Sequence, residues 1–323
     1  MIPAVPDLAR ALRTVVLGCL GVTAGEEVLV VVDPTTRGLG ESLRETAAAA
    51  GADAVLAVMD ERENDGSEPP RSIAAALGAC DVFIAPTSRS LSHTDARKRA
   101  SEAGARGATM PGATEEMLAR VMGVDLERMR QRSRAVANIL DQGSRARITC
   151  PKGSDLRLDL SGRRGLPDDG ELSAPGAFGN LPCGEGFIAP LTGEGRIVAA
   201  SLAPVGISDE PATLSFREGR VVDAQGGLGP EYLRRLQAQG ELGTNLAELG
   251  VGTNEKAKLT GAILEDEKIL GTVHVACGAS AGFGGNVSVP IHLDVVVLDA
   301  SLEVDGQAVL EEGRFLLDET ATR

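Results

Sequence analysis

The chain holds three histidines, and two of them, His274 and His292, fall in apolar segments of its C-terminal half. In the segment IHLDVVVLD, His292 and Asp294 stand two positions apart. Alternate side chains of a β-strand point to the same face, so this imidazole and this carboxylate project together. Such a pair is typical of ligands for divalent metals such as Zn²⁺ or Fe²⁺. A buried histidine bonded to its neighbouring carboxylate explains the pair equally well.

His274 lies in GTVHVACG, where apolar residues on both sides predict a central strand. A buried imidazole without a partner costs roughly 1–3 kcal/mol, so His274 needs a polar neighbour there. Taken alone, a structural role is the simpler explanation. The glycine-rich stretch 278–286 that follows lets the backbone approach a ligand closely, which favours a functional role.

Two isolated carboxylates complete a possible ligand set. Glu185 stands alone among Pro, Gly and apolar residues in NLPCGEGFIAP, and Glu248 precedes a glycine-rich turn in NLAELGVGTN. A lone acid in apolar surroundings is either neutral or faces a cation. For each acid alone a surface position is the simpler explanation. The two imidazoles and three carboxylates together, however, are able to hold one or two divalent metals. The acidic run 265–267, in contrast, is expected to form a solvated turn.

The elements around these residues predict two domains. Apolar runs at 27–33, 53–60 and 80–86 alternate with helical patterns, which is typical of βαβ units and a doubly wound parallel sheet. Beyond residue 144 short strands and Gly- or Pro-bearing turns predominate. The predicted fold is therefore an α/β domain over 1–144 with a doubly wound parallel sheet, followed by an α+β metal-bearing domain over 145–323. No G-x-G-x-x-G follows the first strand, so no nucleotide site is expected.

A second cluster of candidates follows the third predicted strand, in TSRSLSHTDARKR. Arg89, His93 and Arg97 precede or open a predicted helix, whose N-terminus favours anions. His93 and Arg97 are therefore predicted to bind a substrate carboxylate. A surface histidine beside a helix cap is the simpler alternative for His93.

Composition narrows the functional classes. The formal net charge is −14, which opposes binding to nucleic acids and to anionic membranes. Aromatic residues make up 2%, which speaks against stacking platforms. The five cysteines form no C-x-x-C pair, a usage typical of a reducing compartment. Neither a signal peptide nor an apolar run of about 18 residues is seen, so we expect a cytoplasmic protein without a membrane span.

Four segments carry a resemblance to a known family. NLPCGEGFIAP, AELGVGTN, DEKILGTVHVACG and IHLD resemble, in order, the metal-site motifs of the thermophilic metallo-aminopeptidases that include aminopeptidases T and S. The motif match covers mostly residues 179–298. The resemblance implies a homodimeric hydrolase that uses two divalent ions (Zn, Co or Mn) to release N-terminal residues from peptides. It also implies a proton carrier, Glu185 or Glu248, and five metal ligands: Glu185, Glu248, His274, His292 and Asp294.

One departure keeps other functions open. The aminopeptidases carry a tyrosine after the third-motif histidine, and by offset Ala281 takes its place here. Losing one oxyanion donor typically lowers the rate by about 10²–10³. A first alternative is a mononuclear Fe(II) dioxygenase that opens hydroxylated heteroaromatic rings, with His274, His292 and Asp294 as the metal triad. A second alternative is a non-catalytic binding protein stabilised by metal. The aminopeptidase-like hydrolase is the function that the motifs favour.

Overall fold

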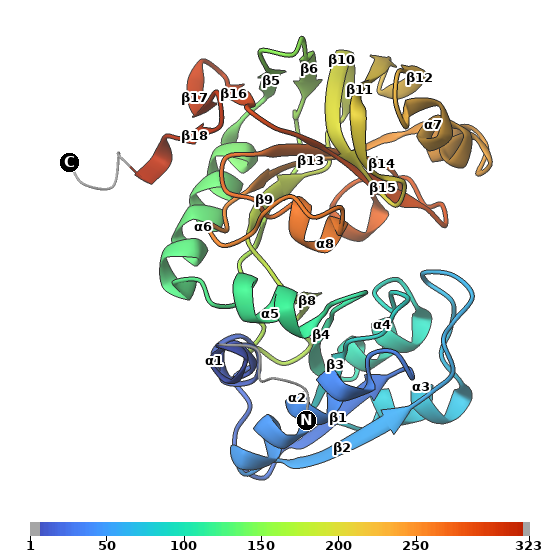
Figure 1. Cartoon of the computed structure of the whole chain (residues 1–323), viewed down its shortest axis with the longest axis vertical. Helices are drawn as coiled ribbons and strands as arrows, with labels where there is room; N and C mark the ends of the chain where they lie inside the picture. Colours follow the sequence, from blue (N-terminus) through green and yellow to red (C-terminus); the bar gives the residue numbers. More distant parts are fainter. Residues whose placement is uncertain (1–6, 319–323) are drawn as a thin grey trace. The chain divides into compact units, whose positions relative to one another are not determined.

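The computed structural model describes residues 7–318 and divides into two compact units (Figure 1). The first unit comprises residues up to Leu126 together with Gly170–Cys183. The second comprises Glu127–Asp169 and the residues from Gly184 onward. Each unit has a sheet of its own and is described separately.

The first unit is built on a parallel sheet with strand order β2-β1-β3-β4-β8. The chain leaves β1 toward β2 on one side and continues toward β3 on the other, which is the winding of a doubly wound sheet. The predicted parallel-sheet fold is therefore confirmed. The strands are β1 (Glu27–Val32), β2 (Asp53–Val58), β3 (Val82–Ala85), β4 (Arg106–Thr109) and β8 (Phe178–Asn180).

Helices connect the strands of this sheet. The side chains of Thr94 and Thr114 accept hydrogen bonds from the backbone N–H groups of Arg97 (3.2 Å) and Met117 (3.1 Å), which caps two of the helices. The helices are α1 (Leu8–Arg13), the π-helix η1 (Thr14–Cys19), α2 (Arg37–Ala49), α3 (Arg71–Leu77), α4 (Asp95–Glu102) and α5 (Glu115–Val121).

The second unit contains a large sheet whose assigned strand pairs are antiparallel, in the order β18-β17-β16-β5-β6-β10-β15-β14-β13-β9-β7. Strands β11 and β12 extend it from β10. This matches the predicted α+β character. The strands are β5 (Arg145–Thr149), β6 (Asp155–Asp159), β7 (Gly165–Asp168), β9 (Glu185–Ile188), β10 (Thr192–Leu202), β11 (Gly206–Arg217), β12 (Arg220–Gln225), β13 (Leu246–Gly252), β14 (Val273–Gly278), β15 (His292–Val297), β16 (Ser301–Val304), β17 (Gln307–Glu311) and β18 (Arg314–Phe315).

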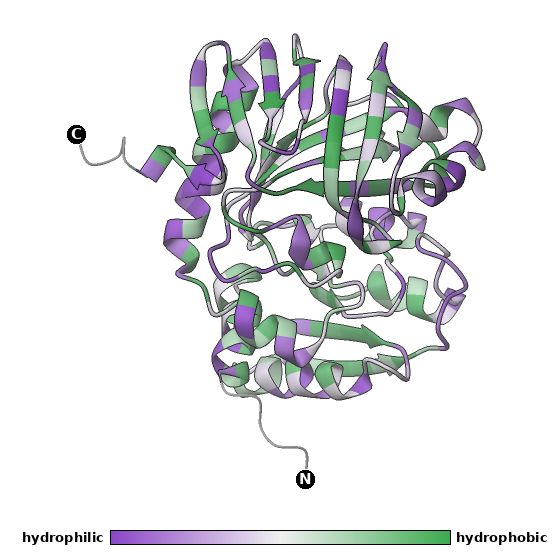
Figure 2. Ribbon diagram, turned by 45° about the horizontal axis from the view of Figure 1, so that its top comes forward, coloured by the Kyte–Doolittle hydropathy of each residue, from purple (hydrophilic) through white to green (hydrophobic). Residues whose placement is uncertain are grey.

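The helices of the second unit are α6 (Leu126–Gln142), α7 (Gly229–Gln237), η2 (Glu241–Thr244), α8 (Ile263–Asp266) and η3 (Ala281–Phe283). Val136 and Leu140 of α6 share a hydrophobic core with strand residues such as Ile148 and Ile188. Figure 2 shows hydrophobic residues concentrated along the strands of the sheets.

The compact units do not follow the predicted boundary at residues 144 and 145. That boundary lies at the end of α6, whose apolar side packs into the core of the second unit. The segment Gly170–Cys183 returns to the first unit because its strand β8 pairs with β4. A single cut in the sequence therefore does not describe the folded units.

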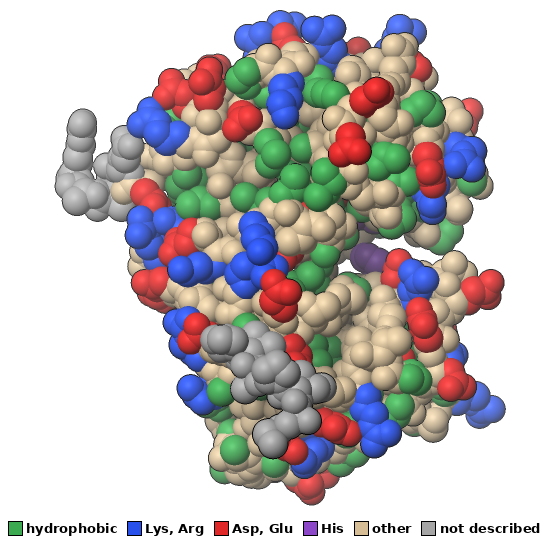
Figure 3. All heavy atoms as spheres, viewed as in Figure 1, with side chains coloured by type: hydrophobic (Ala, Val, Ile, Leu, Met, Phe, Trp, Pro, Cys, Tyr) green, Lys and Arg blue, Asp and Glu red, His purple; other side chains and the backbone are tan. Residues whose placement is uncertain are grey.

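Two surface features bear on the functional class. Basic and acidic side chains are interspersed on the face drawn in Figure 3, rather than gathered by sign. Among the described residues, no helix is both long and apolar enough to cross a membrane.

Candidate metal centre

Four adjacent strands of the second unit bring five side chains together, which we call the His–carboxylate cluster. Glu185 opens β9, Glu248 lies in β13, His274 in β14, and His292 and Asp294 in β15. Four of these residues are buried, and the side chain of His292 is 20% exposed. The cluster is the set that the sequence patterns single out, and the fold places its members side by side.

Glu248 lies at the middle of the cluster. Its two carboxylate oxygens are 3.3 Å from His274 Nε2 and 3.4 Å from His292 Nε2. On one side, His274 Nε2 is 2.9 Å from Glu185 Oε2. On the other, His292 Nε2 is 3.5 Å from Asp294 Oδ1. Carboxylates and imidazoles therefore alternate along a continuous chain of contacts.

Two overlapping groups have the spacing to hold a metal ion. The first group is Glu185, Glu248 and His274, and the second group is Glu248, His292 and Asp294. Within each group the candidate ligand atoms lie within 4.8 Å of one another. The triad of His274, His292 and Asp294 that the sequence suggests is divided between these groups, with Glu248 common to both.

The donor atoms fit a divalent cation. Glu185 Oε2 and His274 Nδ1 are buried and have no hydrogen-bond partner among the described residues. A buried polar atom without a partner destabilises the fold. Carboxylate oxygens and imidazole nitrogens are also the ligands that Zn²⁺, Mn²⁺ and Fe²⁺ accept. Of the two unpaired atoms, Glu185 Oε2 belongs to the first group, and a metal ion in that group would give it a partner.

Contacts behind the ligand atoms fix His292. Its Nδ1 lies 2.8 Å from the carbonyl oxygen of Ala279, so Nδ1–H donates to that carbonyl and Nε2 faces the carboxylates. The ring of Phe283 meets the imidazole edge to face, with centroids 5.6 Å apart. This geometry leaves Nε2 as the nitrogen that a metal would bind, in place of the proton that the neighbouring carboxylates otherwise hold there.

Gly250 provides the space for His274. The two residues pair across β13 and β14, and a β-carbon at Gly250 would lie 2.0 Å from His274 Nε2. The imidazole therefore lies directly over the glycine backbone. This position has no room for any other residue without displacing the ring.

A buried lysine that sequence reasoning missed lies beside the cluster. The side chain of Lys268 is 1% exposed, and its Nζ lies 2.5 Å from Glu185 Oε1, 2.7 Å from Glu267 Oε1 and 3.2 Å from Asp168 Oδ2. We call these four residues the Lys268 network. The available signal was a single lysine within DEKILGTVHVACG, directly before a buried strand.

The pKa values of the acids and bases in the cluster and in the Lys268 network are set by burial and by the opposite charges of their neighbours. Burial opposes ionisation of Glu185, but Lys268 and His274 hold the pKa of that carboxyl at about 2. Burial raises the pKa of Asp168 to about 7 and that of Glu267 to about 8, against the attraction of Lys268. Although burial lowers it, the pKa of His292 is raised to about 10 by Asp294 and Glu248. Metal binding would replace the protons that the cluster otherwise retains.

The expectation of a solvated turn at 265–267 is wrong. Glu265 and Asp266 are fully buried. The carboxylate of Asp266 accepts hydrogen bonds from Thr260 N (2.7 Å), Gly261 N (3.0 Å) and Ser201 Oγ (2.9 Å). Local backbone donors and Lys268 satisfy these acids, which a count of charges along the chain does not reveal.

Tyr232, the chain's one tyrosine, has a structural position in α7. It is fully buried, and its hydroxyl donates to the carbonyl oxygen of Leu293 at 2.7 Å. Ala203 N donates to the next carbonyl along the strand, that of Asp294, at 2.9 Å. The two bonds anchor the strand segment that carries His292 and Asp294.

We expect Tyr232→Phe to weaken metal binding by roughly 10-fold, as loss of an outer contact commonly does. The free energy of unfolding should fall by about 1 kcal/mol, because one hydrogen bond is removed. Calorimetric titration with metal and thermal unfolding measure the two effects. Thr244→Val is a matched control, because Thr244 Oγ1 also donates to a backbone carbonyl, that of Glu241 at 3.0 Å. Equal losses of metal affinity in both variants would contradict the anchoring role.

The predicted substrate-binding residues His93 and Arg97 belong to the first unit. His93 is exposed just before α4. Arg97 Nε donates to the carbonyl of Ser92 at 2.7 Å, and its guanidinium lies 4.0 Å from the centroid of the Phe178 ring. Arg97 is therefore held by local contacts, and a substrate role for either residue stays a prediction.

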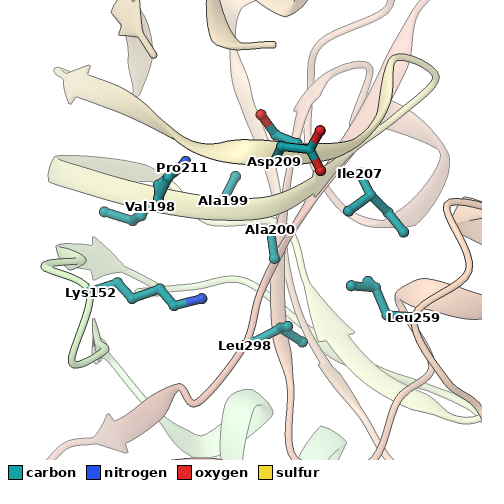
Figure 4. A pocket seen from close by; sticks show the side chains of 10 residues that line it. Lys152, Val198, Ala199, Ala200, Ile207, Asp209, Pro211, Leu259 and Leu298 are labelled. Carbon is teal, nitrogen blue, oxygen red and sulfur yellow. The ribbon is translucent and has the colours of Figure 1, made fainter. Parts of the chain in front are cut away.

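The second unit also contains a separate pocket of about 190 Å³ (Figure 4). Its lining includes Lys152, Ile207, Asp209 and Leu298, and none of the residues described as lining it belongs to the His–carboxylate cluster. The pocket is therefore distinct from the candidate metal centre.

Imidazoles and carboxylates clustered on adjacent strands have the composition and spacing of a divalent-metal site. A family model described as NicX, 2,5-dihydroxypyridine 5,6-dioxygenase, matches residues 7–317. The chain therefore belongs to the 2,5-dihydroxypyridine 5,6-dioxygenase family.

Individual relatives agree with this assignment. A curated 2,5-dihydroxypyridine 5,6-dioxygenase of Pseudomonas putida KT2440 is 24% identical over 222 residues, which span 63% of this chain and 63% of the relative. The solved structure of the dihydroxypyridine dioxygenase from that strain superposes with a TM-score of 0.83 at 20% identity, covering 97% of this chain and 98% of the other. Wild-type AmpT from Thermus thermophilus gives a TM-score of 0.70, also at 20% identity, covering 96% and 99%.

The aminopeptidase assignment, and with it the hydrolase and metalloprotease function, is therefore wrong. The dioxygenase family model covers nearly all described residues, whereas AmpT shares the fold alone. The four motifs lie on or beside the strands that position the cluster. They are therefore a signal of the shared fold and do not identify the reaction. The homodimer that the resemblance implies stays a prediction, and light scattering tests it.

Proposed function

We propose that the chain is a ring-opening dioxygenase that acts on a small dihydroxylated nitrogen heteroaromatic such as 2,5-dihydroxypyridine. Both atoms of O₂ enter the product while one bond of the ring breaks. The observation that carries the proposal is the buried His–carboxylate cluster in a chain that the dioxygenase family model matches over residues 7–317. The name of the Pseudomonas putida relative supplies the substrate class.

The cofactor in this proposal is a single Fe(II) ion. The second group, Glu248, His292 and Asp294, would hold it, with His274 on the far side of Glu248. Imidazole and carboxylate ligands that leave positions open are typical of non-haem Fe(II) oxygenases. When bound, the iron supplies the redox chemistry that allows O₂ to react with the ring.

The protein's own residues would prepare the substrate. A hydroxyl group of the substrate must lose its proton as the ring becomes electron-rich, and a nearby base favours that loss. Glu248 is a ligand of the proposed iron and would exchange its proton for the metal, so it is the less available of the two predicted proton carriers. Glu185 lies outside the second group and remains the predicted proton carrier, with Oε1 bound to Lys268 and Oε2 2.9 Å from His274 Nε2.

Two phenylalanines give the site an aromatic wall. Phe283 contacts His292, and Phe187 of β9 meets Phe283 edge to face, with centroids 5.6 Å apart in both pairs. The low aromatic content of the sequence argues against an aromatic stacking surface, but two of the six phenylalanines lie at this site. A flat heteroaromatic ring would pack against Phe283, beside the proposed metal ligands.

We expect Phe283→Ala to raise the KM for the dihydroxypyridine by about 2- to 12-fold, the range that corresponds to one aromatic contact of about 0.5–1.5 kcal/mol. Phe283→Leu keeps apolar volume and should raise it less. Steady-state kinetics measure KM, and iron content per chain checks that the metal stays bound. An unchanged KM in the alanine variant would exclude Phe283 from the substrate site.

The proposed function is tested with an oxygen electrode. Protein loaded anaerobically with Fe(II) should consume O₂ when 2,5-dihydroxypyridine is added, and protein loaded with Zn(II) should not. Absence of O₂ uptake by iron-loaded protein with this compound and with related dihydroxylated heteroaromatics would refute the proposal.

A further inference from the structure

We propose that Lys268 is a fixed internal cation that limits the His–carboxylate cluster to one divalent ion. The inference rests on the proposed metal-dependent function and goes beyond it, because the cluster alone offers ligands for two ions. The observation behind it is an ammonium group enclosed by carboxylates immediately next to one of the two candidate metal positions.

The ammonium group has the contacts of a bound cation. Its three carboxylate partners come from separate segments: Asp168 ends β7, Glu185 opens β9, and Glu267 follows α8. With the side chain 1% exposed, Lys268 has no access to solvent that could replace these partners. The fold therefore fixes the position of the ammonium group through these three carboxylates, much as ligands fix the position of a metal ion.

The two metal groups differ in their relation to this ammonium. Glu185 belongs to the first group, and it uses Oε1 for Lys268 while Oε2 faces His274. A divalent ion in the first group would share Glu185 with the ammonium and would lie beside a charge of the same sign. At such short range in a buried site, like charges repel strongly.

The second group lacks this conflict. In the described part of the chain, the ion pairs of Lys268 involve none of Glu248, His292 and Asp294. The negative charges of Glu248 and Asp294 therefore remain available to a divalent ion. One ion in the second group and one ammonium beside the first group together neutralise the cluster.

Removal of the ammonium should open the first position. In Lys268→Met, the side chain keeps a similar length but loses its charge, so the carboxylates of Glu185, Asp168 and Glu267, whose side chains are 8–13% exposed, are left without their cation. We expect this variant to bind a second divalent ion per chain, whereas wild type and Lys268→Arg bind one. Lys152→Met removes an exposed lysine of the same unit and should leave the count at one.

The measurement is metal content per chain after loading with excess Mn²⁺ under anaerobic conditions and desalting. One ion in wild type and two in Lys268→Met support the proposal. One ion in both proteins overturns the role of Lys268 and leaves the metal-dependent function intact. No ion in wild type would overturn the proposed function as well.

A second measurement uses the wild-type protein alone and does not depend on the stability of a variant. Anomalous diffraction from crystals grown with excess Mn²⁺ should give one peak, between Glu248, His292 and Asp294. A second peak between Glu185, Glu248 and His274, with Lys268 still in contact with Glu185, would overturn the proposal.

Discussion

Asp294→Ala should lose both metal binding and ring-opening activity while the fold persists. Asp294 lies in the second group, and its carboxylate is 3.5 Å from His292 Nε2. Loss of an outer contact to a metal ligand already lowers metal affinity by roughly 10- to 100-fold. Removal of a ligand should therefore lower it by at least about 100-fold and reduce activity to background. His292→Ala is expected to behave in the same way.

Metal content per chain, O₂ uptake and circular dichroism measure the three quantities for each variant. Glu303→Ala provides a control, because it removes an exposed carboxylate from β16 of the same sheet. That variant should retain full metal content and activity. If Asp294→Ala retained full metal content, the second group would not be the metal site.

Gly250→Ala should have the next largest effect, although it adds a single methyl group. The new β-carbon would lie 2.0 Å from Nε2 and 2.2 Å from Cε1 of His274, so the imidazole has to move. A displacement of about 1 Å at a reacting site can lower the rate by roughly 100-fold. Overpacking of a buried position also destabilises the fold by about 1–3 kcal/mol.

Gly282→Ala is the matched control for this substitution. Gly282 lies in η3, a β-carbon there meets no heavy atom within 4 Å, and its backbone does not need a left-handed conformation. Its activity and thermal stability should equal those of wild type. Wild-type activity in Gly250→Ala would show that the position of His274 is not critical for the reaction.

The members of the cluster could be predicted because local rules govern them. The two-residue period of a strand places His292 and Asp294 on one face, and isolated acids in apolar segments indicate Glu185 and Glu248. The alternation of strands and helices likewise predicts the parallel sheet of the first unit. Each of these inferences needs only neighbouring residues in the sequence.

Other features depend on contacts between distant segments. Lys268 forms an ion pair with Asp168, which lies a hundred residues earlier in the sequence, and no local sequence pattern relates the two residues. Glu265 and Asp266 are buried, and backbone donors and Lys268 supply partners for the acids at 265–267. The return of Gly170–Cys183 to the first unit depends on the pairing of β8 with β4.

The reaction was the least predictable property, because one fold supports different reactions on similar clusters. The four motifs lie on or beside strands β9, β13, β14 and β15, and AmpT shares the fold that contains these strands. The residue that differed was Ala281, at the offset of the aminopeptidase tyrosine. That departure was the strongest sequence signal against a peptidase.

The most direct test of the dioxygenase account follows the oxygen atoms. Iron-loaded protein is mixed with 2,5-dihydroxypyridine under heavy-isotope dioxygen, and the product is analysed by mass spectrometry. The account predicts a ring-opened product that carries both heavy oxygen atoms of one O₂ molecule. A product with oxygen derived only from water, or unchanged substrate beside fully iron-loaded protein, would contradict it.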